Sequence, residues 1–287
     1  MNSHSFILPV KQKTVVMGIL NVTPDSFSDG GLYLGVNAAV ERATQMVDEG
    51  ADIIDIGGES TRPGSRGVFA DEEIQRVVPI IMAVKKKFGK RVLISVDTYK
   101  SVVAEAAVRA GAQIINSLGG SRFDPKIYAV AKKHTASIIV YHIKGEPRTM
   151  QKGEIFYKDV VKEIAKFFQN EIDVAKKFGV VKKQLWLDPG IGFGKTVAQN
   201  LEIIHRLKEF ETFHLPIVIG VSRKSHLGIL LKDAFHLPEP PLSTERLEAA
   251  LAETTVAVLN GACIVRTHDV LATKKCLAVV DALKYEK

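Results

Sequence analysis

Short apolar runs recur along this chain, and nearly every one ends in a side chain that can bind or carry charge. A continuous apolar run is typical of a strand buried in a parallel sheet. Active sites of parallel barrels lie at the C-terminal ends of the strands, so the pattern predicts one site built from many strands. The runs span residues 15–20, 52–56, 92–96, 114–115, 138–141, 185–187, 217–221 and 263–265, and the side chains that follow include Asn21, Asp97, Asn116, His142, Asp188, Lys224 and Arg266.

Segments with helical spacing alternate with these runs and predict the fold class. Strands that alternate with helices indicate βαβ units, and eight units predict an α/β fold, a (β/α)₈ TIM barrel. We expect a single domain over residues 1–287, with residues 1–14 as an N-terminal extension. An open doubly wound sheet is the alternative, but it would concentrate its site at one switch point. The helical segments span residues 36–49, 71–88, 100–110, 125–134, 157–178, 197–213, 243–259 and 269–283, and residues 237–242 are interpreted as a surface excursion.

Composition narrows the class of protein. The 287 residues carry a net charge of +7, spread over helical segments without a nucleic-acid-binding motif, so we expect no nucleic-acid partner. No apolar segment approaches the roughly 20 residues that span a bilayer, and the N-terminus lacks a signal-peptide pattern, so we expect no membrane partner. The two cysteines suggest no disulfide framework, and together these features predict a cytoplasmic protein.

Three polar strand ends would meet at the barrel mouth. Asp97, Asn116 and Asp188 could accept hydrogen bonds from an N–H and NH₂ pair, and the amide could also donate one. Each of them alone could simply cap the following helix. The three together with Lys224 favour the binding of a flat polar heterocycle.

Asp188 opens a glycine-rich segment that ends in Lys195 and Thr196. The glycine spacing does not match a phosphate-binding P-loop. We interpret the glycines as allowing close approach of the backbone to a ligand, with Phe193 as an apolar wall.

Basic residues gather at the last two strand ends. Lys224 offers a point charge, Arg223 a planar fork, and Ser225 lies near a helix N-terminus that suits a carboxylate or phosphate. Arg266 and His268 are two residues apart and can share a face. These residues predict an anion site, in preference to a helix-capping role for His268.

Two segments closely resemble the signature loops of the dihydropteroate synthase family. They are residues 17–31, Met-Gly-Ile-Leu-Asn-Val-Thr-Pro-Asp-Ser-Phe-Ser-Asp-Gly-Gly, and residues 57–64, Gly-Gly-Glu-Ser-Thr-Arg-Pro-Gly. Further matches at 95–98, 187–195, 222–225 and 265–269 follow the order of the family. The resemblance implies a TIM-barrel transferase, usually a homodimer, that condenses 6-hydroxymethyl-7,8-dihydropterin pyrophosphate with p-aminobenzoate. Dihydropteroate and pyrophosphate would be the products, and Mg²⁺ the cofactor.

The resemblance also implies a role for each matching residue. Asp97, Asn116, Asp188, Lys224 and Arg266 would hold the pterin, with Arg266 stacked on it, and Arg266 and His268 would bind the pyrophosphate. Asn21 would meet the pyrophosphate and its Mg²⁺. The p-aminobenzoate site would comprise Thr61, Arg62, Pro63, Phe27, Phe193 and Ser225, with Asp29 fixing the closed first loop, and the catalytic set would be Asp97, Lys224, Asn21, Arg266 and His268.

The implied mechanism needs no nucleophilic side chain. Pyrophosphate would leave first, and Asp97 would stabilise the resulting pterin cation until the amine attacks. Two positions depart from the family pattern. Ser117 stands where the family usually has Asp, which would remove a carboxylate beside the pterin pocket, and Tyr141 replaces a frequent Met but keeps a flat face for the pterin.

Two other functions fit part of the pattern. A pterin-binding methyltransferase that serves a corrinoid protein would share the barrel and the pterin contacts, but it would not need the pyrophosphate residues. A catalytically silent paralogue that binds pterin as a sensor would be supported only by Ser117.

Overall fold

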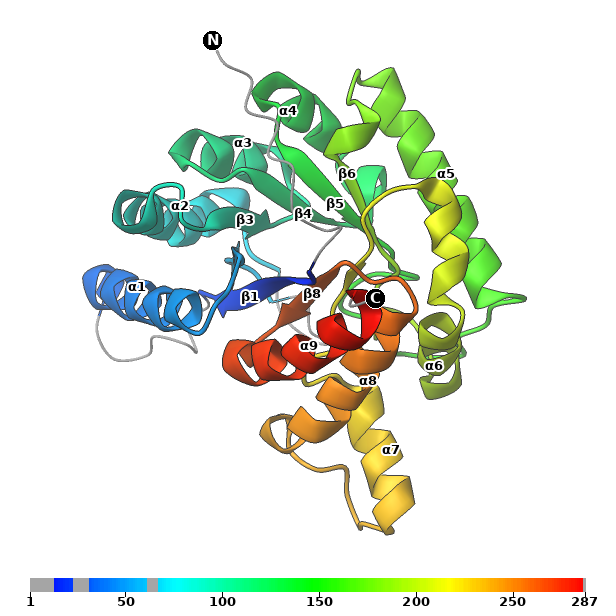
Figure 1. Cartoon of the computed structure of the whole chain (residues 1–287). Coiled ribbons are helices and arrows are strands. Elements are labelled where there is room, and N and C mark those ends of the chain that lie inside the picture. Colours follow the sequence, from blue (N-terminus) through cyan, green and yellow to red (C-terminus); the bar gives the residue numbers. More distant parts are fainter. Residues whose placement is uncertain (1–12, 23–30, 61–66, 286–287) are drawn as a thin grey trace.

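The structure is a computed structural model that describes residues 13–22, 31–60 and 67–285. Within these residues, eight parallel strands form one sheet in the order β6-β5-β4-β3-β2-β1-β8-β7, and the helices lie around it (Figure 1). An isolated parallel bridge between Leu187 and Ile217 joins the two outer strands, and Leu187 N donates to Pro216 O at 2.9 Å. This bridge closes the sheet, so the predicted (β/α)₈ barrel is confirmed and the open-sheet alternative is wrong.

The elements match the predicted strand and helix segments closely. The strands are β1 (Val15–Asn21), β2 (Ile53–Gly57), β3 (Leu93–Asp97), β4 (Ile114–Leu118), β5 (Ser137–Tyr141), β6 (Leu185–Asp188), β7 (Val218–Ile219) and β8 (Ile264–Thr267). The α-helices are α1 (Gly31–Asp48), α2 (Ala70–Phe88), α3 (Ser101–Ala110), α4 (Ile127–His134), α5 (Val160–Lys177), α6 (Val197–His205), α7 (Ser225–Phe235), α8 (Leu247–Leu259) and α9 (Val270–Tyr285). Short 3₁₀ turns are η2 (Gly120–Arg122), η3 (Lys182–Gln184), η4 (Leu207–Phe213) and η5 (Ser243–Glu245).

The elements differ from the prediction most clearly in three places. Helix α1 begins before residue 36, and the segment 197–213 divides into α6 and the 3₁₀ turn η4. Strand β7 is followed by two helices, α7 and α8, and the Pro-rich residues 237–242 connect them. The first twelve residues of the predicted N-terminal extension lie outside the described residues. None of the helices described is long and apolar enough to cross a membrane.

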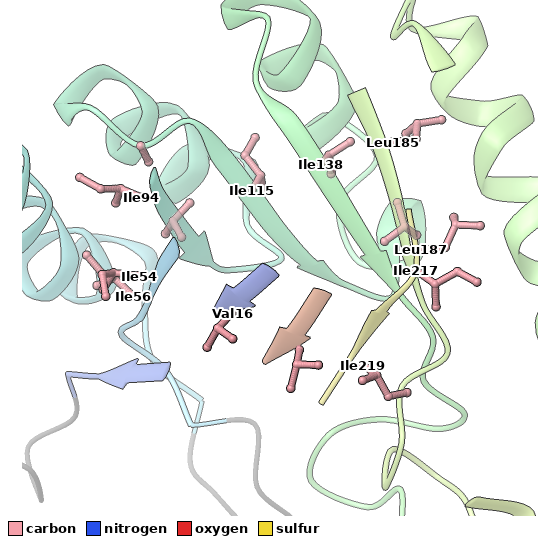
Figure 2. Close-up of a cluster of buried hydrophobic side chains, with 14 of the residues drawn as sticks. Val16, Ile54, Ile56, Ile94, Ile115, Ile138, Leu185, Leu187, Ile217 and Ile219 are labelled. Carbon is pink, nitrogen blue, oxygen red and sulfur yellow. The ribbon is translucent and has the colours of Figure 1, made fainter. Parts of the chain in front are cut away.

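Strand alternation sorts the core into two apolar layers. Successive side chains of a strand point to opposite faces. The outer set packs against the surrounding helices (Figure 2) and includes Val16, Ile54, Ile56, Ile94, Ile115, Ile138, Leu185, Leu187, Ile217 and Ile219. The inner set fills the lower part of the barrel and comprises Val15, Met17, Ile53, Leu93, Ile114, Ile139, Trp186, Val218 and Ile264.

The inner layer fixes which polar side chains face the barrel axis. Residues two positions beyond an inner apolar residue share its face. Asp55 therefore faces inward like Ile53, Asn116 like Ile114, and Asp188 like Trp186. By the same alternation Ser117 lies on the opposite face from Asn116. Ser117 is fully buried on that face, so position 117 points toward the helix layer and away from the barrel axis.

Candidate active site

A guanidinium held by two carboxylates lies at the centre of the inward-facing polar residues. Arg266 Nε donates to Asp55 Oδ2 at 2.6 Å, and its Nη2 donates to Asp97 Oδ2 at 2.7 Å. Asn116 Nδ2 donates to the same Asp55 oxygen at 3.1 Å. Side chains from β2, β3, β4 and β8 therefore meet in one hydrogen-bonded cluster. This brings Asp97, Asn116 and Arg266 together as the sequence predicted.

Asp55 is the member of this cluster that the pattern of strand ends did not assign to the site. Its side chain is fully buried, and a buried carboxylate is stable only with a charged or hydrogen-bonding partner. A lone acidic residue inside the apolar run 52–56, on the same face as Ile53, was the signal for a partner across the barrel. That partner is Arg266, 211 residues later in the chain.

The single positive charge of Arg266 is shared between the Asp55 and Asp97 carboxylates. This sharing affects the pKa values of Asp97 and Arg266. Burial and the neighbouring Asp55 carboxylate raise the pKa of Asp97 to about 7, although the Arg266 charge opposes the rise. Burial disfavours the charged form of Arg266, but Asp55 and Asp97 outweigh it and raise the pKa of its guanidinium above the usual range. Arg266 stays charged, and Asp97 can change its charge near neutral pH.

A hollow opens above this cluster and collects the other predicted pterin residues. Its lining comprises Asn116, Tyr141, Asp188, Gly190, Ile191, Phe193, Gly220, Lys224 and Arg266. Tyr141 donates from its hydroxyl to Asp97 Oδ1 at 3.2 Å, and its ring meets Phe193 edge-on with centroids 5.3 Å apart. Tyr141 thus gives the pocket a flat wall, as expected, and adds a hydrogen bond to Asp97.

Asp188 and Lys224 form the second charged part of the hollow. Asp188 Oδ1 accepts the backbone N–H of Gly190 at 2.7 Å, and burial raises the pKa of Asp188 to about 6. Lys224 Nζ lies 4.1 Å from the ring centroid of Phe193, a cation–π distance. Burial and the Arg266 charge lower the pKa of Lys224 to about 8, against the attraction of Asp188. Lys224 is therefore a cation at neutral pH that is poorly compensated in the free protein.

Lys195 holds the glycine-rich segment beneath Phe193. Its Nζ donates to Gly190 O at 2.8 Å and to Phe193 O at 3.0 Å, and lies 3.0 Å from His142 Nδ1. Burial lowers the pKa of both Lys195 and His142 well below their usual values. His142 directly follows Tyr141, and its ring meets Phe167 of α5 edge-on with centroids 5.0 Å apart, so it lies behind the pocket wall. In the sequence, His142 is the polar end of a strand and Lys195 lies in a glycine-rich segment that does not match a P-loop. The sequence does not indicate that the two side chains meet.

Gly190 is a position where only glycine fits, and this gives a stability prediction. Its φ is +69°, and a Cβ atom there would lie 1.9 Å from His142 O. Gly153 has a similar φ of +76°, with nothing within 4 Å. We expect Gly190→Ala to lower the free energy of unfolding by more than about 3 kcal/mol, and Gly153→Ala by about 1 kcal/mol, the cost of the left-handed backbone alone. Urea unfolding checks both, and equal losses would contradict the steric argument.

The predicted anion residues lie around the start of α7. Ser225 is its first residue and is exposed, and Ser222 Oγ lies 3.1 Å from His268 Nδ1. The guanidinium of Arg223 was expected to be available for an anion, but it is paired within the protein. It binds both carboxylate oxygens of Asp269, at 3.1 and 2.6 Å, so it ties the turn before α7 to the turn after β8.

Asn21 ends β1 with an exposed side chain on the same rim. A Cβ atom placed on Gly57 would lie 3.9 Å from Asn21 Oδ1 and 3.4 Å from Asp97 Cβ, so both flank the end of β2. Among the described residues, no three His, Cys, Asp or Glu side chains gather as a metal site. Five predicted residues of the two loops lie outside the described residues: Phe27, Asp29, Thr61, Arg62 and Pro63.

The pKa values predict a bell-shaped dependence of kcat/KM on pH. Asp97 and Asp188 lose their charge as the pH falls through about 7 and about 6, and Lys224 loses its charge as the pH rises through about 8. The carboxyl pKa values are raised, so their contribution to stability is full below the unfolded value of 3.8 and is lost as the pH rises through about 6 to 7. The acid limb therefore reflects protonation and not unfolding. Rate profiles and thermal unfolding over the same pH range check this, and a flat rate profile would contradict it.

The mouth of the (β/α)₈ barrel places carboxylates and an amide around a buried guanidinium. This arrangement suits a flat nitrogen heterocycle, and comparison with known proteins indicates a pterin-binding enzyme. The pterin binding enzyme family matches residues 17–268. The dihydropteroate synthase of Synechocystis sp. is 44% identical over 272 residues, which cover 95% of this chain and 91% of the relative. That of Escherichia coli is 43% identical and covers 93% and 90%. A dihydropteroate synthase structure from Clostridium difficile, in the presence of pteroic acid, has a TM-score of 0.88 at 40% identity and covers 98% of this chain and 100% of the other. The chain therefore belongs to the dihydropteroate synthase family, as its signature loops predicted.

Proposed function

We propose that this protein is an active dihydropteroate synthase. It condenses 6-hydroxymethyl-7,8-dihydropterin pyrophosphate with p-aminobenzoate and releases 7,8-dihydropteroate and pyrophosphate. The observation that carries the proposal is the cluster of Asp55, Asp97, Asn116 and Arg266 beside Asp188 and Lys224. A Xanthomonas albilineans dihydropteroate synthase in complex with 7,8-dihydropteroate has a TM-score of 0.84 at 34% identity, covering 99% of this chain and 98% of the other, which supports the same chemistry here.

The pterin lies in the hollow above Arg266. The carboxylates of Asp97 and Asp188 accept its ring N–H and NH₂ groups, and Asn116 supplies a donor and an acceptor. The ring is held between the planar guanidinium and the wall of Tyr141 and Phe193. Buried, prearranged partners of this kind hold a ligand without reorganising when it binds.

The reaction begins with cleavage of the bond between the exocyclic carbon and the pyrophosphate oxygen. Pyrophosphate departs with the electron pair toward the Arg266 cation and His268. The pterin cation that remains is stabilised by the Asp97 carboxylate. The p-aminobenzoate nitrogen then attacks that carbon and releases one proton.

The amine substrate is proposed to bind between Lys224, the start of α7 and the two signature loops. Its carboxylate suits the N–H groups around Ser225 and the Lys224 charge. Phe193 packs against its ring. The loop residues Phe27, Asp29, Thr61, Arg62 and Pro63 complete the site and keep water away from the cation.

Mg²⁺ is proposed as the cofactor, with Asn21 as its protein ligand. A single exposed amide oxygen on the rim fits this ion, because Mg²⁺ commonly uses one or two protein oxygens and completes its shell with substrate phosphates and water. When bound, it neutralises charge on the leaving pyrophosphate.

The protein is further proposed to be a cytoplasmic homodimer. The two free thiols, Cys263 and Cys276, suit a reducing compartment. Helices α7 and α8 and their connection expose apolar side chains, among them Phe235 and Leu242 at 69% each, as an association surface would. We expect Phe235→Glu to shift the sedimenting species toward the monomer, and Phe156→Glu, at a site 67% exposed elsewhere, to leave it unchanged. A monomeric wild type would refute the dimer.

One assay tests the activity and separates the alternatives. The protein is incubated with pterin pyrophosphate, p-aminobenzoate and Mg²⁺, and pyrophosphate release is measured with and without the amine. Formation of dihydropteroate is the expected result. Tight pterin binding without turnover would favour the silent paralogue, and methyl transfer from methyltetrahydrofolate to a corrinoid protein would favour the methyltransferase.

A further inference from the structure

Lys100 joins the two ends of the loop that follows β2. This loop leaves the barrel after Gly57 and returns at the start of α2. Lys100 Nζ donates to Glu59 Oε2 at 2.5 Å on the outgoing end and to Val68 O at 2.7 Å on the returning end. A third hydrogen bond goes to Glu73 in the first turn of α2. Each ammonium N–H therefore has its own acceptor, and the direction of the side chain is fixed.

The three charged side chains of this cluster are shielded from water. Lys100 is 18% exposed, Glu59 10% and Glu73 1%. Hydrogen bonds that involve charged groups are stronger than neutral ones, and removal of the shared cation would leave two nearby carboxylates without it. The Lys100 contacts are therefore a strong link between the ends of the loop.

The outgoing end of the loop has additional supports. Arg76 Nη1 donates to Gly58 O at 2.7 Å, and Tyr99 donates to Glu59 Oε1 at 3.1 Å. A Cβ atom on Gly58 would lie 2.9 Å from Val77, so the backbone packs directly on α2. This end would keep its place without Lys100.

The returning end has a different environment. Phe69, next to Val68, is 86% exposed and contributes little packing. Lys100 reaches the Val68 carbonyl from the turn after β3, only three residues beyond Asp97 in the active site. Three residues span at most about 10 Å, so the returning end is tied to the turn that carries the catalytic carboxylate.

We propose that Lys100 is a positioning residue for the amine substrate: it fixes the separation of the two described loop ends, at Glu59 and Val68, and ties both to the turn that follows Asp97. The inference rests on the proposed function, because that function assigns this loop to the p-aminobenzoate site. Lys100 is not among the residues that line the pterin hollow. Its removal is expected to affect the amine more than the pterin, whose pocket is built from strand ends.

The test compares Lys100→Met with Lys100→Arg, and uses Lys133→Met as the matched control. Lys133 also pairs with a glutamate, Glu105 at 2.8 Å, but is 58% exposed on the outer surface. The KM for each substrate and kcat are measured by pyrophosphate release, together with thermal unfolding. We expect Lys100→Met to raise the KM for p-aminobenzoate roughly tenfold or more and that for pterin pyrophosphate less than about threefold. Lys100→Arg should recover much of the loss, and Lys133→Met should resemble wild type.

Each other result overturns the inference. An unchanged p-aminobenzoate KM, or an equal rise for both substrates, would show that Lys100 has no selective positioning role. If Lys100→Met does not fold, Glu59→Gln replaces it, since it weakens one arm and keeps the Lys100–Glu73 pair; a selective but smaller rise is then expected, and no selective rise refutes the inference. An inactive wild type would instead refute the proposed function, and the inference with it.

Discussion

Lys224→Ala is expected to lose at least about 100-fold in kcat/KM while the protein stays folded. Lys224 lies in the hollow over Phe193 and directly before the first residue of α7, so its charge can reach both the pterin and the carboxylate of the amine. Loss of a single prearranged electrostatic donor typically costs about 100- to 1,000-fold in kcat.

The stability of this variant should change little. Burial and Arg266 lower the pKa of Lys224, which means that its surroundings disfavour the charge in the free protein. A change in unfolding free energy within about 1 kcal/mol is expected, well below the loss in rate. Rate assays and urea unfolding are compared with Lys232→Ala, a control about 12 Å further along the same helix. Near-normal turnover by Lys224→Ala would refute its role.

The sequence predicts the rim of the barrel well because both signals are local. Each apolar run marks a strand, and the residue that ends it marks the rim. Asp97, Asn116, Asp188 and Arg266 were found in this way, and the structure brings them together.

Local patterns predict less about which way a side chain faces. His142 also follows an apolar run, but it meets Lys195 behind the pocket. Asp55 lies inside a run, where its polar character looks like an exception. Counting in twos from the inner apolar residues would have assigned both, because the alternation of a strand is regular once one inward residue is known.

Contacts between distant segments are the part that the sequence does not reveal. Arg223 was expected to bind an anion, but it pairs with Asp269, 46 residues away. Lys100 likewise depends on where the loop after β2 returns. Such pairs are set by the closure of the barrel, and a single sequence carries no signal for them. Residues 243–259 were predicted to be helical and Ser225 to lie near a helix N-terminus, but residues 237–242, which connect α7 and α8, were interpreted only as a surface excursion.

Arg266→Ala is expected to weaken pyrophosphate binding roughly tenfold or more, and free pterin binding by a smaller factor. A charge-assisted hydrogen bond contributes about 1.5–3 kcal/mol, which corresponds to a factor of roughly 10 or more. The variant should also be less stable by about 3 kcal/mol, because fully buried Asp55 loses its charged partner and keeps only the Asn116 amide.

Combining Arg266→Ala with Asp55→Asn separates these two effects. An amide at position 55 no longer needs a cation, so the double variant should regain most of the stability and still bind pyrophosphate weakly. Calorimetric titration with pyrophosphate and Mg²⁺, and with free pterin, measures the binding, and exposed Arg109→Ala serves as the control. Equal weakening of both ligands would count against an anion-binding role. Arg266 would then act chiefly by holding the Asp55 and Asp97 carboxylates in place for the pterin ring, the role that its two short ion pairs already support.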